Sequence, residues 1–218
     1  MPIRPVLPDP QEKRHARRIA AGLAGAYPEN ISALHFADPW ECLAATILSA
    51  QCTDKKVNEC TPALFAAWRG PKAMARAAPR EIEPYIRSIG LYRAKARYLV
   101  ASAQAVMARF GGVVPERLED IASLPGAGRK TANCVLANAY GQPAIMVDTH
   151  CIRVTRRLGL HQLAAPDRIE GRLKALLPRR QWTPFSRRII RHGRECCAAR
   201  KPRCGACPLA GDCREWGA

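Results

Sequence analysis

Apolar residues recur with a helical period along most of this chain of 218 residues. In the segments 40–48, 96–110 and 182–190 they return every three or four positions, which places them on one face of a helix. Asp38 and Thr53 stand at typical helix starts, and glycines follow several of the periodic runs. The pattern predicts short helices that are joined by short turns.

Two stretches, 113–114 and 145–147, have the composition of strands, but both are too short to build a sheet. Hydrophobic residues make up 48% of the chain, which is enough for one large domain or two modest ones with cores of their own. We therefore expect an all-α fold.

The chain is strongly basic, with 35 Lys and Arg against 18 Asp and Glu, a net charge of +17 and a pI near 10.0. Such a surface suits a polyanion, and we expect nucleic acid. A basic protein without such a partner, or one bound to acidic lipid, is the alternative. The sequence has no apolar run of about 18 residues, and its proline-rich N-terminal segment lacks the apolar core of a signal peptide. We expect a cytoplasmic, nucleoid-associated protein without a membrane partner.

Ten cysteines are present, and five of them cluster near the C-terminus. Without an export signal, this clustering indicates metal ligation in preference to disulfides. Cys197, Cys204, Cys207 and Cys213 have the spacing C-x6-C-x2-C-x5-C. Thiolates suit zinc or an iron–sulfur cluster, and the chemistry alone leaves both open. We interpret Cys196 as a spare buried thiol.

Arg200, Lys201 and Arg203 lie in the first loop between these cysteines. A loop closed by a metal presents positive charge to phosphates without the entropy cost of ordering a flexible arm. The three residues are therefore predicted DNA contacts, and a merely solvated basic loop is the alternative.

Residues 117–140 predict a short helix, a glycine turn and a second helix that begins near Arg129, which together form a helix-hairpin-helix. Gly126 and Gly128 allow backbone amides to approach a ligand closely, and the positive end of the second helix faces the same point. A DNA phosphate fits there, with Arg129 and Thr131 as further predicted contacts. Nucleotide binding or an ordinary helix turn are the alternatives.

Lys130 lies in the first turn of that second helix, beside Arg129. The helix dipole and the neighbouring cation both disfavour an ammonium group there, and an amine must lose its proton before it attacks a carbon atom. Lys130 is therefore a candidate nucleophile. From its context alone, a lysine that contacts phosphate is the alternative.

Asp148 precedes another periodic segment, whose apolar positions include Cys151, Val154 and Leu158. Taken by itself, Asp148 is a helix N-cap, and His150 is a first-turn or core histidine. A carboxylate fixed at a helix start is also preorganised toward whatever occupies an adjoining cleft.

Five strings, in this order and spacing, resemble the endonuclease III family: SAQCTD, SIGLY, LPGAGRKTAN, VDTHCIRV and HGRECCAARKPRCGAC. The resemblance covers nearly all residues from about 30 to 213 and implies two α-helical domains that flank a DNA-binding cleft. Residues 32–142 would form a six-helix domain with the hairpin, and residues 143–218 an iron–sulfur cluster domain. Residues 1–31 would form an N-terminal arm and helix that join the cluster domain.

The resemblance also implies the site. The family pairs a hairpin lysine with an aspartate, as with Lys130 and Asp148, and its four-cysteine loop holds a [4Fe-4S] cluster. Gln51 and Leu91 match positions that fill the space of a flipped base and wedge the duplex, and His150 joins the predicted DNA contacts. A helix-end glutamine and a core leucine are the alternatives for Gln51 and Leu91.

The implied activity is that of a bifunctional DNA N-glycosylase and AP lyase, acting as a monomer on double-stranded DNA with oxidised pyrimidines or abasic sites. The lysine would form a Schiff base, and β-elimination would cut the strand. Cys52 stands where the family has a small residue, which leaves the shape of the pocket floor open. One alternative is a monofunctional mismatch glycosylase, against which Lys130 argues. The other is a non-catalytic DNA-binding module with structural zinc.

Overall fold

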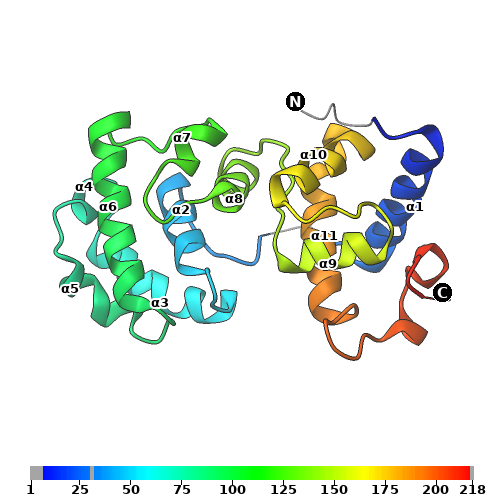
Figure 1. The fold of residues 1–218 in the computed structure, drawn as a ribbon. Helices are drawn as coiled ribbons and strands as arrows, with labels where there is room; N and C mark the ends of the chain where they lie inside the picture. Colours follow the sequence, from blue (N-terminus) through cyan, green and yellow to red (C-terminus); the bar gives the residue numbers. More distant parts are fainter. Residues whose placement is uncertain (1–6, 30–31, 217–218) are drawn as a thin grey trace. The chain divides into compact units, whose positions relative to one another are not determined.

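A computed structural model describes residues 7–29 and 32–216. The first six residues of the predicted N-terminal arm, the pair 30–31 and the last two residues of the chain lie outside the described residues. Within the described ranges every regular element is a helix and no strand is present, which confirms the predicted all-α fold (Figure 1). Both candidate strand segments are irregular connections. Among the described helices, none is both long and apolar enough to cross a membrane.

The chain divides into two compact units. One is formed by Met1–Ile31 together with Pro143–Ala218, and we call it the terminal unit. The other, Ser32–Gln142, we call the hairpin unit. Each unit has its own cluster of buried hydrophobic residues and therefore a hydrophobic core of its own.

The hairpin unit, all of whose residues are described, contains seven α-helices and one 3-10 helix: α2 (Pro39–Leu48), α3 (Asp54–Ala67), α4 (Gly70–Met74), α5 (Pro79–Ile82), η1 (Glu83–Ile86), α6 (Tyr92–Phe110), α7 (Leu118–Ala122) and α8 (Arg129–Ala139). Helix α2 is buried along almost its whole length and packs against α8, α6 and α3. Asp38 caps α2 by accepting a hydrogen bond of 2.8 Å from the N–H of Glu41, and Thr53 caps α3. Both predicted helix starts are confirmed.

Prolines explain why the hairpin unit has seven α-helices where six were expected. Pro71, Pro79 and Pro84 each stand in the first turn of a separate short element between α3 and α6. A proline is well suited to a first turn and disfavours continuation of a preceding helix, because it has no N–H and its ring clashes with the turn before it, although α3 accommodates Pro62 in its interior. The chain is therefore broken into short elements there.

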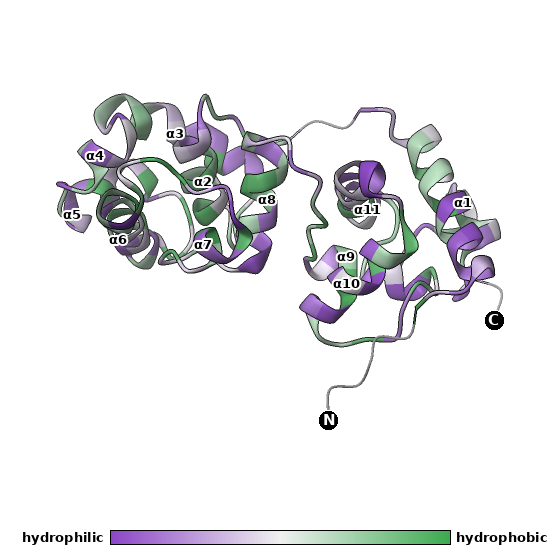
Figure 2. Ribbon diagram, turned by 90° about the horizontal axis from the view of Figure 1, so that it is seen from above, coloured by the Kyte–Doolittle hydropathy of each residue, from purple (hydrophilic) through white to green (hydrophobic). Residues whose placement is uncertain are grey.

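The described part of the terminal unit contains four α-helices and three 3-10 helices: α1 (Pro10–Ala26), α9 (Thr149–Arg157), α10 (Pro166–Leu176), η2 (Arg179–Gln181), α11 (Trp182–Glu195), η3 (Cys204–Ala206) and η4 (Ala210–Asp212). Hydrophilic and hydrophobic bands alternate along α1 (Figure 2), as in a helix with one apolar face. The buried face contributes Ile19 and Leu23 to a core that also holds Val154 and Phe185.

Close packing of α11 against α9 depends on Gly193. A Cβ atom at this position would lie 2.9 Å from the Cβ of His150, which is closer than real side chains approach. Any larger residue would therefore push the end of α11 away from the start of α9. This contact matters because the start of α9 carries the predicted site residue His150, and the predicted cysteine loop follows α11.

Candidate functional site

The predicted hairpin is present as α7, a glycine turn and α8, which begins at Arg129 as predicted. Gly126 has a φ of 76°, a left-handed conformation that favours glycine. A Cβ on Gly126 would also lie 2.7 Å from the Cβ of Tyr98 on α6. Gly128 is the N-cap of α8 and offers no side chain to its first turn. The turn therefore presents an exposed helix N-terminus, the geometry that binds anions.

Lys130 is exposed in the first turn of α8, between exposed Arg129 and half-buried Thr131. Since it lies on the surface, its amine is accessible to a large substrate. It belongs to the hairpin unit, whereas Asp148 belongs to the terminal unit.

Gln51 and Leu91 lie side by side in the hairpin unit and share an unusual backbone. Their φ angles are 53° and 61°, in the left-handed region that costs an ordinary residue about 1–2 kcal/mol. A Cβ built on Gly90 would lie 3.9 Å from the carbonyl oxygen of Gln51, so the two turns touch. Leu91 is 62% exposed, which excludes the alternative of a core leucine. Strain of this kind is characteristic of functional sites.

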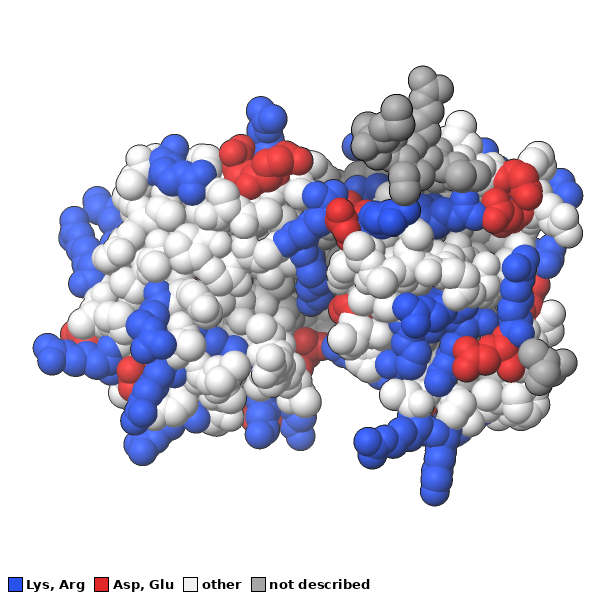
Figure 3. Space-filling view, viewed as in Figure 1, with Lys and Arg blue, Asp and Glu red and all other residues white. Residues whose placement is uncertain are grey.

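Lys201 is the third described non-glycine residue with a positive φ, at 52°. It lies in the loop after α11 with Arg200 and Arg203, and all three side chains are exposed. Basic side chains are widespread over the surface, and acidic ones are fewer on the face that Figure 3 shows. The sequence-predicted basic loop is therefore accessible to a polyanion.

Asp148 is the N-cap of α9, as predicted. Its Oδ1 accepts a hydrogen bond of 2.7 Å from the backbone N–H of Cys151, and the side chain is half-buried. Burial, and then the charge of Asp148, raise the pKa of the Cys151 thiol to about 12. Cys151 is therefore a neutral core residue at physiological pH, and the carboxylate of Asp148 is fixed in direction by the helix start.

His150 links α9 to the end of α11. Its Nδ1 lies 3.2 Å from the guanidinium of Arg153, which donates to the carbonyl oxygens of Gly193 and Cys197 at 2.9 Å each. Because the guanidinium can only donate, Nδ1 is the acceptor and the ring proton lies on Nε2. His150 is half-buried in this network, so its ring is oriented by contacts that the sequence did not reveal.

Arg153 and Arg157 are functional candidates that the sequence did not single out. Arg157 donates to the carbonyl oxygen of Ala198 at 2.8 Å and approaches the Sγ of Cys197 at 3.5 Å. The two arginines stand four positions apart, on one side of α9. Together they fasten the start of the cysteine loop to α9. The only sequence signal was their helical spacing in the basic string RVTRR.

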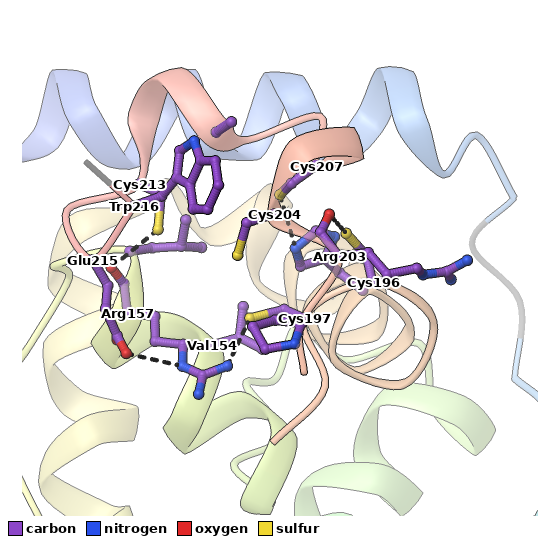
Figure 4. Close-up of a pocket in the computed structure, with 14 residues that line it drawn as sticks. Val154, Arg157, Cys196, Cys197, Arg203, Cys204, Cys207, Cys213, Glu215 and Trp216 are labelled. Carbon is purple, nitrogen blue, oxygen red and sulfur yellow. Dashed lines mark hydrogen bonds and ion pairs between the residues drawn. The ribbon is translucent and has the colours of Figure 1, made fainter. Parts of the chain in front are cut away.

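All five C-terminal cysteines line one cavity of about 180 Å³. Cys197, Cys204 and Cys213 turn their sulfur atoms toward the same space (Figure 4). Burial raises the pKa of Cys207 to about 11, and neighbouring thiols contribute to the rise. Cys196 is buried, as predicted. A set of converging thiols is a soft donor set, which fits an iron–sulfur cluster.

Comparison with protein families gives two matches. Residues 44–179 match the family described as HhH-GPD superfamily base excision DNA repair protein. Residues 197–213 match the iron-sulfur binding domain of endonuclease III. The second match begins at Cys197 and ends at Cys213, which are the first and last cysteines of the predicted ligand set.

Solved structures of similar fold include complexes with DNA. A trapped endonuclease III–DNA covalent intermediate superimposes with a TM-score of 0.89 at 40% identity, covering 93% of this chain and 96% of that chain. A non-covalent endonuclease III–DNA complex gives a TM-score of 0.88 at 40% identity over 93% and 95% of the two chains. A thermostable thymine-DNA glycosylase, at 24% identity and a TM-score of 0.84 over 93% and 97%, shares the fold.

Curated relatives extend over nearly the whole chain. Endonuclease III of Synechocystis is 46% identical over 203 residues, which is 93% of each protein. Endonuclease III of Bacillus subtilis is 40% identical over 190 residues, or 87% of each. With the hairpin, the converging cysteines and these similarities, the chain belongs to the endonuclease III family, whose cofactor is a [4Fe-4S] cluster.

Proposed function

We propose that Lys130 and Asp148 perform the reaction of this family. The protein is a bifunctional DNA N-glycosylase and AP lyase of base excision repair that removes oxidised pyrimidines. The observation that carries the assignment is the exposed amine of Lys130 at the start of α8, in a fold that matches a relative trapped in covalent linkage to DNA. We assign Lys130 as the nucleophile and Asp148 as its carboxylate partner.

The damaged base must first leave the helical stack, which costs a few kcal/mol and is easiest for lesions that stack or pair badly. Gln51 and Leu91 are proposed to fill the vacated space. Two features support this assignment: both side chains are exposed, and both backbones are held in a strained conformation next to each other. A backbone that is already fixed by the fold loses little further conformational entropy when its side chain enters the duplex.

The neutral amine of Lys130 then attacks C1′ of the sugar, and the bond from C1′ to the base breaks. The base leaves with a proton. The C1′–O4′ bond then opens, O4′ takes up a proton from solvent, and the nitrogen, having lost one proton, forms the protonated Schiff base with C1′. Asp148 stabilises the positive charge that develops on the sugar and accepts a proton from the amine. Loss of the C2′ proton then expels the 3′ phosphate by β-elimination, and water releases Lys130.

Contacts to the DNA backbone are assigned to two surfaces. In the hairpin, the exposed N-terminus of α8 with Gly126, Gly128, Arg129 and Thr131 would hold one phosphate. In the terminal unit, His150 and the loop of Arg200, Lys201 and Arg203 would contact others. Backbone contacts of this type position the protein without reading sequence, as a repair enzyme requires.

We assign Cys197, Cys204, Cys207 and Cys213 as the ligands of the cluster. Four thiolate bonds to one cluster cross-link the loop, so that its basic residues face DNA in a fixed arrangement. Arg157 supports the assignment, since its guanidinium lies beside the Cys197 sulfur and would offset negative charge there. We further propose that the enzyme acts as a monomer on double-stranded DNA with damaged pyrimidines or abasic sites, in the nucleoid.

Borohydride trapping on an abasic oligonucleotide tests the nucleophile. The intact protein should give a covalent protein–DNA adduct, because borohydride reduces a Schiff base to a stable amine. Lys130→Ala should give none, while Lys72→Ala, an exposed lysine of the same unit, should give as much as the intact protein. No adduct from intact protein would favour a monofunctional glycosylase, and an undiminished adduct from Lys130→Ala would assign the nucleophile elsewhere.

A further inference from the structure

Three metal-binding atoms converge at the wall of the cysteine cavity, in a set that differs from the proposed cluster ligands. They are Nε2 of His192 and the Sγ atoms of Cys196 and Cys207, and all lie within 4.8 Å of one another. His192 is 1% exposed and Cys196 8%. Two soft thiols and an imidazole are ligands that zinc takes in proteins.

The distances fit a single tetrahedral ion. With Zn–S bonds of about 2.3 Å and Zn–N bonds of about 2.0–2.1 Å, tetrahedral angles place S and N about 3.6 Å apart, and two S atoms about 3.8 Å apart. The observed separation of Nε2 of His192 from Sγ of Cys207 is 3.7 Å. Small side-chain rotations would bring the remaining pairs from their limit of 4.8 Å into range.

The surrounding structure orients the three groups. Cys196 is the C-cap of α11, and its backbone N–H donates to the carbonyl oxygen of His192 at 2.9 Å, which holds the two residues together. The Nδ1 of His192 is 3.0 Å from the hydroxyl of Tyr27, which leaves Nε2 to point at the thiols. Metal-binding histidines usually have such a partner on the second nitrogen.

Cys196 is likewise held in place. The N–H of Arg203 donates to the Cys196 carbonyl at 3.0 Å, and the Cys196 thiol donates to the Arg203 carbonyl at 3.7 Å. Two contacts between the same residues fix the thiol against the loop that carries Cys207. The site is therefore preorganised by the protein fold.

We propose that His192, Cys196 and Cys207 form a binding site for one zinc-like divalent ion, and that this site and the iron–sulfur cluster exclude each other. Three protein ligands leave the fourth tetrahedral position to water or a further thiolate. Exclusion follows because both centres require the single Sγ of Cys207, which is also a proposed cluster ligand, so zinc and the iron of the cluster compete for it. Zinc bound to the cluster-free chain would therefore hold Cys207 away from a new cluster.

Cobalt(II), a coloured substitute for zinc, tests the site in the full-length chain freed of its cluster. Thiolate-to-cobalt charge-transfer absorption should appear with one equivalent of metal. Cys196→Ser should weaken binding by at least about tenfold, because a thiolate ligand is lost. Cys204→Ser is the matched control from the same loop and should leave the affinity within about twofold, since Cys204 belongs to the cluster set alone.

The opposite pattern would overturn the proposal. If Cys196→Ser binds cobalt like the unaltered chain while Cys204→Ser loses tight binding, the ion occupies the four cluster cysteines. Absence of charge-transfer absorption in the unaltered chain would also refute the site. Cluster absorption of the iron-loaded Cys196→Ser protein checks its folding, because Cys196 is outside the proposed cluster set.

Competition during cluster assembly, which starts from the same cluster-free chain, provides a second measurement that does not depend on cobalt. Zinc added before iron and sulfide should slow the return of cluster absorption in the unaltered protein. In Cys196→Ser, the same amount of zinc should slow it several-fold less. Equal inhibition of the two proteins would contradict the exclusion. Because the cobalt result depends only on the three ligands, failure of the cluster assignment would leave it unchanged.

Discussion

Asp148 combines two roles that a pair of substitutions can separate. As a cap, its Oδ1 accepts the 2.7 Å hydrogen bond from the Cys151 N–H. As the proposed partner of Lys130, it must carry a negative charge. Asparagine keeps the cap but not the charge, whereas alanine removes both.

The expected magnitudes follow from the cap geometry. Asp148→Ala loses the N-cap bond, which costs about 1 kcal/mol, and the favourable interaction of its charge with the start of α9, worth about 0.3–1 kcal/mol. Asp148→Asn loses only the charge interaction. The alanine variant should therefore unfold with about 1 kcal/mol less free energy than the asparagine variant.

The rate of base removal should depend on the negative charge of residue 148 and not on the free energy of unfolding. Because a positioned acid or base contributes about 10²- to 10⁴-fold to a rate, both Asp148 variants should lose base removal by that order. Asp38 provides the matched control, since it caps α2 through a 2.8 Å bond to the N–H of Glu41 and has no proposed role in the reaction. Asp38→Ala should be destabilised by about 1 kcal/mol and keep its activity.

Urea denaturation measures the free energies of unfolding, and single-turnover kinetics on an oligonucleotide with one oxidised pyrimidine measures base removal. An Asp148→Asn enzyme as fast as the unaltered protein would show that Asp148 is only a cap. A slow Asp38→Ala enzyme would show that loss of a cap impairs activity by itself, and the reasoning would fail.

Three further predictions concern the wedge, the basic loop and a buried lysine. Leu91→Gly should change the free energy of unfolding by no more than about 1 kcal/mol, because relief of the left-handed strain offsets the added entropy of the unfolded chain. The variant should slow base removal from duplex DNA more than cleavage at an abasic site, and kinetics on the two substrates would show this difference. Replacement of any one of Arg200, Lys201 and Arg203 by alanine should make the plot of log affinity against log salt concentration less steep by about 1. Fluorescence anisotropy measures this slope, and an unchanged slope would remove that residue from the interface. Lys95 is 3% exposed, its Nζ has no hydrogen-bond partner among the described residues, and burial lowers its pKa below 10.5. Because the unfolded chain then binds more protons than the folded chain between the lowered pKa and 10.5, the free energy of unfolding should rise with pH across that window. Lys95→Met should raise the free energy of unfolding by about 1–3 kcal/mol at neutral pH and make it less dependent on pH. Urea denaturation measures both effects, and a loss of stability would contradict this account.

The sequence alone determined the features that depend on neighbouring residues. The 3.6-residue period gave the helices, and the caps at Asp38, Thr53 and Asp148 fixed where three of them begin. The glycine turn predicted that α8 starts at Arg129. Local signals of this kind suffice because a helix start is decided within one turn of the chain.

The tertiary structure decided the features that join distant segments. Arg153 meets the carbonyl of Cys197 across 44 positions, and Tyr27 meets His192 across 165, so no local pattern could reveal either contact. For Leu91 the sequence left a core position as the alternative to the predicted wedge, and the fold holds the side chain exposed on a strained backbone. The sequence named Cys196 a spare thiol. Only packing of α11 against the cysteine loop placed it beside His192 and Cys207, because convergence of ligands is a property of the folded chain.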